Sequence, residues 1–263
     1  MKNTNPAKIE KKCRNIGIIG CGHISNQYLA NLSQINDVEV IACSDIDIKK
    51  AKNQSLKYGI PKTLSTKELL SDNTIDIILN LTVPNSHYEV SIAALKSGKH
   101  VYSEKPLAIN KKDGNEIIRN ASELGLQVGC APDTFLGGGI QTCRKIIADG
   151  LIGKPIAATA FMTNHGHENW HPSPEFYYQK GGGPMFDMGP YYLTALIYLL
   201  GRAVRVAGAT QKTFSSRTIT SQPDRIRQIK VEEGFKYTLP NLNLDEPTNF
   251  SKDNCIILSS EKL

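Results

Sequence analysis

One stretch of the sequence decides the fold: Asn15-Ile-Gly-Ile-Ile-Gly20-Cys21-Gly22-His23-Ile24-Ser25. A short apolar run typical of a buried strand leads directly into the pattern GxGxxG, with serine in the third glycine position. Gly20 allows a tight turn, Gly22 lets the backbone approach a pyrophosphate, and the small Ser25 permits a helix to pack closely on the strand. Backbone N–H groups at the start of that helix can bind the phosphates. The stretch therefore predicts a dinucleotide-binding turn between a strand and a helix.

An acidic residue at the end of the next strand-like run extends this prediction. Asp45 follows the apolar run 38–44 and lies 25 positions after Gly20. A carboxylate there can bind both hydroxyls of an adenosine ribose and would repel a 2′-phosphate, so the pattern favours NAD over NADP. The plainer alternative is a glycine turn followed by an aspartate that only caps a helix.

Strand-like and helix-like runs alternate through the first half of the chain. Strands are expected at residues 15–19, 38–44, 75–81, 100–103 and 127–130, and helices at 24–35, 47–58, 86–97 and 111–124. A further short helix is expected from Ser65, which has the capping-box spacing to Glu68. This order predicts right-handed βαβ units and a doubly wound parallel sheet.

The pattern changes after about residue 131. We expect a helix at 140–148, a strand at 156–163, a long loop at 164–183, a helix at 190–200 and a strand at 205–210. Loops of that length inside a compact domain are usually functional or disordered. Beyond about residue 220 the chain is polar and poorly patterned.

Composition excludes several classes of protein. The chain has 263 residues, 40% apolar and 21% charged, which is typical of one or two globular domains. Its net charge is +6, but residues 1–14 carry five basic groups and one acidic group, so the excess lies mostly in a short leader and predicts no nucleic-acid partner. The apolar run 191–200 is too short to span a membrane. The N-terminus lacks a secretory signal, and the six cysteines form no CxxC pair, which favours reduced thiols in the cytoplasm.

Two further motifs follow predicted strands. They are Thr82-Val-Pro84-Asn85-Ser-His87 and Gly98-Lys-His-Val-Tyr-Ser-Glu104-Lys105-Pro106. With the glycine turn, they make residues 14–210 resemble the glucose–fructose oxidoreductase, inositol dehydrogenase and MocA family (Gfo/Idh/MocA). The resemblance implies an N-terminal Rossmann domain and a C-terminal α/β domain with an open, mostly antiparallel sheet. It also implies NAD(P)-dependent redox chemistry on sugars, polyols or related compounds.

The resemblance also assigns residues of the first domain. The resemblance implies that Lys105 is a catalytic residue, whose ammonium can hydrogen-bond the reacting hydroxyl. The peptide bond before Pro106 can be cis. His87 either lines the cofactor or lies in the first turn of a helix without contacting a ligand. The residues expected to bind the cofactor are Gly20, Gly22, His23, Ile24, Asp45, Thr82, Pro84, Asn85, His87, Glu104 and Lys105.

In the second domain the family motif Asp-x-Gly-x-His-x-x-Asp is matched only in part. Asp187 and Gly189 fit, whereas Tyr191 stands in place of the histidine and Thr194 in place of the second aspartate. The Tyr191 hydroxyl can both donate and accept, so Asp187 and Tyr191 are expected to complete a catalytic proton path with Lys105. The alternative is that Asp187 caps a helix and Tyr191 belongs to the core.

Other residues are expected to contact the substrate. Asp133 lies in a glycine-rich turn that either roofs the substrate pocket or forms a flexible connection. The segment 165–171 contains three histidines and a glutamate, but it lacks the i, i+4 spacing of a helical zinc site, so no metal is predicted. We expect a hydrogen bond from His167 and ring stacking on Trp170 instead. The substrate set is Asp133, His167, Trp170 and Tyr191.

These observations give one function and two alternatives. We expect a basic leader at 1–13, an NAD-binding Rossmann domain at 14–130 and a substrate and oligomerisation domain at 131–263. The expected activity is hydride transfer between NAD and a sugar, polyol or related hydroxyl or carbonyl compound.

After about residue 230 the alternation needed for further strands is missing, which predicts an incomplete sheet and argues against the family's homo-oligomer. A non-catalytic NAD- or sugar-binding regulator and an inactive shortened family member are the alternatives.

Overall fold

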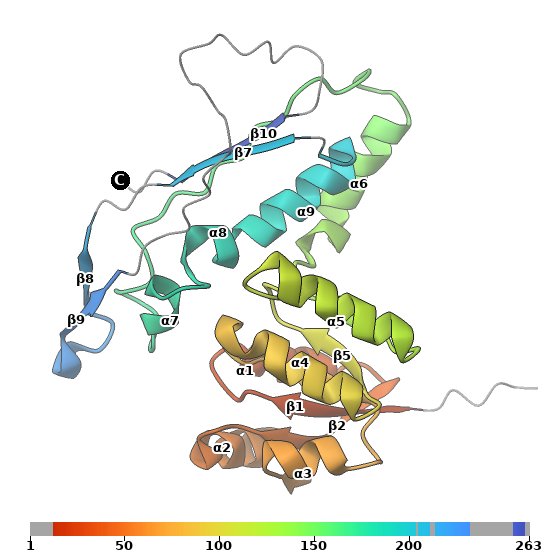
Figure 1. Ribbon diagram of the computed structural model, residues 1–263, viewed down its shortest axis with the longest axis vertical. Coiled ribbons are helices and arrows are strands. Elements are labelled where there is room, and N and C mark those ends of the chain that lie inside the picture. The colour runs from red at the N-terminus through yellow and green to blue at the C-terminus, as the bar shows by residue number, and fades with distance from the viewer. Residues whose placement is uncertain (1–12, 204, 211–213, 232–254, 261–263) are drawn as a thin grey trace, which may run out of the picture. The chain divides into compact units, whose positions relative to one another are not determined.

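The computed structural model describes residues 13–203, 205–210, 214–231 and 255–260. The chain divides into two compact units, Met1–Cys130 and Ala131–Leu263 (Figure 1). Most of the basic leader and most of the tail after residue 231 therefore lie outside the described residues.

The first unit is built on a six-stranded parallel sheet with the order β3-β2-β1-β4-β5-β6. Its strands are β1 Arg14–Ile19, β2 Val38–Ser44, β3 Lys62–Thr63, β4 Ile77–Asn80, β5 His100–Ser103 and β6 Val128–Cys130. The order reverses between β1 and β4, and ligands of such sheets bind beyond the carboxyl ends of the strands at this switch point. The predicted doubly wound parallel sheet is confirmed.

Helices cover both faces of this sheet. They are α1 Ser25–Leu32, α2 Ile48–Tyr58, α3 Thr66–Ser71, the 3-10 turn η1 Pro84–Ser86, α4 His87–Lys96 and α5 Lys111–Glu123. One apolar cluster joins α3, α4 and α5 to the sheet, and Figure 1 shows α4 and α5 side by side. A second cluster joins α1 and α2 to it. The predicted capping box starts α3, because the Ser65 hydroxyl accepts from the Glu68 N–H and Glu68 accepts from the Ser65 N–H.

The second unit contains helices and short strand pairs. Its helices are η2 Thr134–Leu136, α6 Gly138–Ala148, α7 Glu175–Tyr178, α8 Gly183–Asp187, α9 Gly189–Leu200 and η3 Pro223–Arg225. Its strands are β7 Arg205–Thr210, β8 Ser216–Ile219, β9 Arg227–Lys230 and β10 Cys255–Ser260. The strands β8 and β9 pair antiparallel, whereas β7 and β10 pair parallel. The α/β class of both units is as predicted.

Two local predictions for this unit are wrong. Residues 156–163 form no strand, and Ile156 and Phe161 are 93% and 80% exposed. A strand must pair its backbone N–H and C=O groups, and no described strand pairs with this segment. The region after residue 220, expected to be polar and poorly patterned, contains β9 and β10. The polar strand β9 (RQIK) pairs with β8, and the largely apolar strand β10 (CIILSS) pairs with β7.

Candidate functional site

The glycine turn after β1 lies in close contact with the backbone at the end of β4. Gly20 has φ +102°, and a Cβ there would lie 2.5 Å from the carbonyl carbon and oxygen of Leu81. Its N–H donates to the Ser44 carbonyl at 2.9 Å. The buried Ser25 hydroxyl donates to the Gly22 carbonyl at 2.7 Å, which ties the start of α1 to the turn. Gly20 therefore forms the tight turn that was predicted for it.

Asp45 lies beside this turn at the end of β2. Its Oδ2 accepts from the Cys21 N–H at 2.7 Å and its Oδ1 from the Asp47 N–H at 2.8 Å. The cap of α2 is Asp47, which accepts from the Lys49 N–H, so Asp45 is not the helix cap of the plainer alternative. Each carboxylate oxygen can accept a second hydrogen bond, which leaves acceptors for ligand hydroxyls.

The buried His87 side chain connects two loops at this edge of the sheet. Nε2 lies 2.9 Å from the Thr82 carbonyl and Nδ1 lies 2.6 Å from the Pro106 carbonyl. His87 is the first residue of α4, and both ring nitrogens face backbone oxygens. Of its two possible roles, the geometry favours the one without a ligand contact. Thr82 is fixed in turn by a hydrogen bond from its hydroxyl to Asn80 at 2.7 Å.

The backbone around Lys105 is held from both sides. Glu104 accepts from the Tyr28 hydroxyl at 2.8 Å and from the Lys105 N–H at 2.9 Å, and His87 holds the carbonyl of Pro106. The Lys105–Pro106 peptide bond is cis, as predicted. The expected cofactor residues follow β1, β2, β4 and β5, so the structure brings their loops to the carboxyl edge of one sheet. His23, Ile24 and Asn85 are exposed there.

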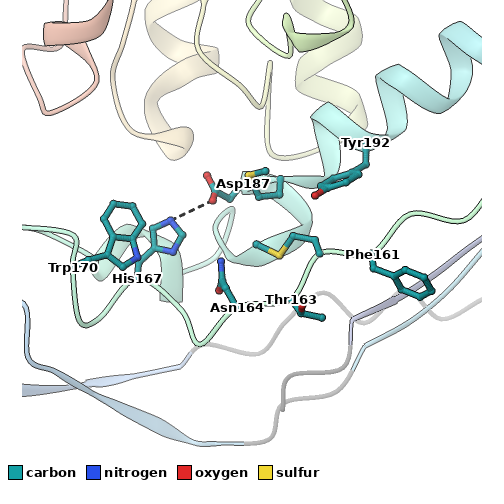
Figure 2. A pocket seen from close by; sticks show the side chains of 9 residues that line it. Phe161, Thr163, Asn164, His167, Trp170, Asp187 and Tyr192 are labelled. Atoms are coloured by element: carbon teal, nitrogen blue, oxygen red, sulfur yellow. Dashed lines mark ion pairs between the residues drawn. The ribbon is translucent and has the colours of Figure 1, made fainter. Parts of the chain in front are cut away.

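The second unit contains a cavity of about 520 Å³ (Figure 2). Its described walls combine apolar and polar side chains: Phe161, Met162, Thr163, Asn164, His167, Trp170, Asp187, Met188 and Tyr192. The structure thus places Asp187, His167 and Trp170 together. Tyr191 lies in the first turn of α9 and the exposed Asp133 lies before η2, and neither is among these lining residues.

Asp187 and His167 face each other at the cavity wall. His167 Nε2 lies 3.3 Å from Asp187 Oδ2, as the dashed line in Figure 2 marks. Asp187 is the last residue of α8, while the residue before α9 is Met188, which has no side-chain cap bond. The alternative in which Asp187 caps the next helix is therefore wrong. The carboxylate instead meets an imidazole 20 residues earlier in the chain.

A buried polar network lies behind this pair. Tyr178 donates its hydroxyl hydrogen to Glu168, and Arg217 donates to the same carboxylate. Burial disfavours the charged form of Glu168, but the hydrogen bonds to its carboxylate and the charge of Arg217 together outweigh burial and lower the pKa of its carboxyl group. Burial and the bond to Glu168 raise the pKa of Tyr178 to about 12. Sequence reasoning missed Arg217, because its contact to Glu168 spans 49 residues and no local pattern marks it.

Two family models match the chain. One, described as an oxidoreductase family with an NAD-binding Rossmann fold, covers residues 14–131. The other, described as the GFO/IDH/MocA C-terminal domain, covers residues 140–239.

The chain belongs to the Gfo/Idh/MocA oxidoreductase family. The resemblance inferred from the motifs is confirmed, and residues 14–131 are an NAD(P)-binding Rossmann domain.

Several members of the Gfo/Idh/MocA family are similar to it over most of its length. The myo-inositol 2-dehydrogenase of Thermotoga maritima is 27% identical over 190 residues, which cover 72% of this chain and 55% of the relative. The 1,5-anhydro-D-fructose reductase of Ensifer adhaerens is 31% identical over 189 residues, 70% of this chain and 56% of the relative. The crystal structure of an NAD-binding oxidoreductase from Klebsiella pneumoniae is 26% identical with a TM-score of 0.67, over 84% of this chain and 61% of that one. The chain spans about half the length of the first two relatives.

The described residues contain neither a metal-binding cluster nor a membrane-spanning helix. Among those the structure describes, no three His, Cys, Asp or Glu side chains lie close enough together to hold a metal ion. No helix in this part of the chain is long and apolar enough to cross a membrane. The five cysteines whose side chains are described, Cys13, Cys21, Cys43, Cys130 and Cys143, are free thiols.

Proposed function

We propose that this chain is an NAD-dependent oxidoreductase that transfers a hydride between the nicotinamide ring and a carbon bearing a hydroxyl or carbonyl group in a sugar, polyol or related substrate. The observation that carries the proposal is the bond between Asp45 and the glycine turn, 2.7 Å from Oδ2 to the Cys21 nitrogen. It fixes a carboxylate beside the phosphate-binding turn, at the switch point where sheets of this order bind dinucleotides.

The same carboxylate is our reason for proposing NAD rather than NADP. Ribose hydroxyls can donate to the remaining lone pairs of Asp45. A 2′-phosphate would bring a second anion against the carboxylate, and like charges at contact distance repel. The preference therefore rests on one charged side chain whose position is fixed by two backbone N–H groups.

The bound nicotinamide cofactor supplies or accepts the hydride. Lys105 hydrogen-bonds and polarises the reacting oxygen, and its backbone N–H is held for this by the Glu104 carboxylate. Asp187 and Tyr191 complete the proton path. Trp170 offers an indole that is 57% exposed for stacking against the ring of a cyclic substrate.

The substrate class is supported by the cavity and by the relatives. Apolar surfaces of Phe161, Trp170 and Tyr192 suit the C–H faces of a ring, while Thr163 and Asn164 suit its hydroxyls. The two curated relatives described above are named for myo-inositol and for an anhydro sugar, both cyclic polyhydroxyl compounds.

One observation favours a second function. Tyr191 occupies the position at which the family motif has histidine. If that change abolishes proton transfer, the chain is a non-catalytic regulator that binds NAD and a sugar on the same scaffold.

The first experiment is a fluorescence titration with NADH and NADPH in parallel, followed by a screen of sugars and polyols for turnover. NADH binding that is tighter than NADPH binding, together with turnover, is the expected result. Binding without turnover would favour the regulator. If neither NADH nor NADPH binds, both proposed functions are overturned.

The role of Lys105 is tested by Lys105→Ala. We expect turnover to fall by about 100-fold or more while the Kd for NADH changes little, since a positioned proton-transfer partner contributes about that much. Lys111→Ala, at an exposed position in the first turn of α5, is the matched control and should behave like the wild type. Unchanged turnover in Lys105→Ala would contradict the assigned role.

A further inference from the structure

The contacts of His167 differ from those of a side chain that binds substrate. The residue is only 6% exposed although it contributes to the cavity wall. Nε2 faces Asp187 Oδ2 at 3.3 Å, and Nδ1 is buried with no hydrogen-bond partner among the described residues. A carboxylate only accepts hydrogen bonds, so the hydrogen of this pair belongs to Nε2. A second hydrogen on Nδ1 would be a buried donor without an acceptor, which disfavours it.

The plane of the imidazole is fixed by neighbouring rings. Tyr177 stacks on it with centroids 3.9 Å apart and an interplanar angle of 19°, and Trp170 lies 4.6 Å away. Tyr177 is itself buried. Tilting the ring out of this plane would therefore break a stacked contact.

The backbone of His167 is fixed as well. Its N–H donates to the Tyr178 hydroxyl at 3.1 Å, and that hydroxyl donates to Glu168, which is paired with Arg217. The preceding Gly166 has φ +116°, and a Cβ there would overlap Glu168 and the Tyr178 hydroxyl. The backbone of His167 is thus linked through Tyr178 to a partly buried ion pair between residues 49 positions apart.

We propose that His167 is a positioning residue that holds the Asp187 carboxylate in its reactive orientation at the cavity. It supplies an imidazole beside Asp187 although position 191, where the family motif has histidine, is tyrosine. This inference rests on the proposed function only in giving Asp187 a part in proton transfer. It gives His167 the role of positioning Asp187 rather than of binding the substrate.

Several titratable or charged groups surround the His167 ring, and each can influence how kcat depends on pH. Those that face it or lie directly behind it are Asp187, His171, Tyr177, Tyr178, Glu168 and Arg217.

The kinetic test compares His167→Phe with His167→Gln. Phenylalanine keeps the stacking but loses the donor, and glutamine keeps an N–H donor of similar reach. We expect His167→Phe to lower kcat by roughly 100-fold, to leave KM and the NADH Kd nearly unchanged and to alter the pH profile of kcat. We expect His167→Gln to recover most of the lost rate. The exposed His165, changed to the same two residues, is the matched control. Equal losses in His167→Phe and His167→Gln would overturn the proposal.

A second readout does not depend on turnover. Nitrogen-15 NMR of the folded chain, which has only six histidines, reports which ring nitrogen carries the hydrogen. We expect the His167 signal, identified by its loss in His167→Gln, to show the Nε2–H form and to change in Asp187→Asn. A signal like that of free imidazole, unaffected by Asp187→Asn, would overturn the inference. Absence of turnover in the wild type would overturn the proposed activity alone.

Discussion

Gly20 and Gly22 lie two residues apart in the same turn, yet their surroundings differ. Gly20 combines a positive φ with a close approach to the Leu81 carbonyl group, whereas a Cβ at Gly22 would meet nothing within 4 Å. The first glycine is therefore required by the fold of the protein itself. The second leaves open space, which a bound pyrophosphate would need.

This contrast predicts different outcomes for two alanine substitutions. Gly20→Ala should lower the free energy of unfolding by about 1–3 kcal/mol or more, the cost of a strained backbone plus steric overlap. Gly22→Ala should change the free energy of unfolding by less than about 0.5 kcal/mol. It should weaken NADH binding by about tenfold or more, or ~1.4 kcal/mol. Thermal unfolding and a fluorescence titration of each variant measure both effects. A Gly22→Ala variant that binds NADH like the wild type would contradict the assignment of this turn.

At the scale of elements, His87 joins the start of α4 to the loop after β5. Its ring lies between the Thr82 and Pro106 carbonyls, and carbonyl oxygens only accept hydrogen bonds. The loop that carries Thr82 and the loop that carries Lys105 are thereby held together by one buried side chain. We expect the geometry of the cofactor edge to depend on this connection.

The substitution His87→Phe tests it, since phenylalanine keeps an aromatic ring but has no N–H to donate to either carbonyl. A buried carbonyl left without a partner costs about 1–3 kcal/mol, so we expect a clear fall in melting temperature and weaker NADH binding. Tyr88→Phe, at the next position of α4, removes a hydroxyl from a half-buried residue and is expected to leave the melting temperature nearly unchanged. Similar melting temperatures for both variants would show that the connection is unimportant for stability.

At the scale of the whole molecule, the first unit has a complete sheet and core of its own. All six strands and both apolar clusters lie within Met1–Cys130. Every hydrogen bond described above for the glycine turn, Asp45, His87 and Glu104 also stays within it. Nothing in that set requires residues of the second unit.

We therefore expect a fragment ending at Cys130 to fold and to bind NADH. Its unfolding in urea should be cooperative, and its Kd for NADH should lie within about tenfold of that of the full chain, a difference of ~1.4 kcal/mol. Circular dichroism during urea unfolding and a fluorescence titration check the two expectations. A fragment that unfolds without cooperativity, or that binds no NADH, would show that the second unit is needed for the first.

The sequence predictions were accurate where the deciding interactions join residues close together in the chain, and failed where they join residues far apart. The limits of β2 and β5 were predicted to the residue, and the capping box of Ser65 and Glu68 was predicted from a spacing of three. Residues 156–163 show the opposite case, because the segment looks like a strand in the sequence but no described strand pairs with it. Pairing partners are chosen by tertiary structure, which a local pattern does not contain.

The sequence by itself determined the Rossmann domain, the position of its glycine turn and the family. Those features depend on residues close together in the chain, such as Gly20 to Ser25 and Glu104 to Pro106, where local backbone geometry restricts which residue types fit. Only the tertiary structure decided that His167 meets Asp187 and that Arg217 pairs with Glu168. Those contacts join residues 20 and 49 positions apart, and they form because folding buries polar groups that must then find partners.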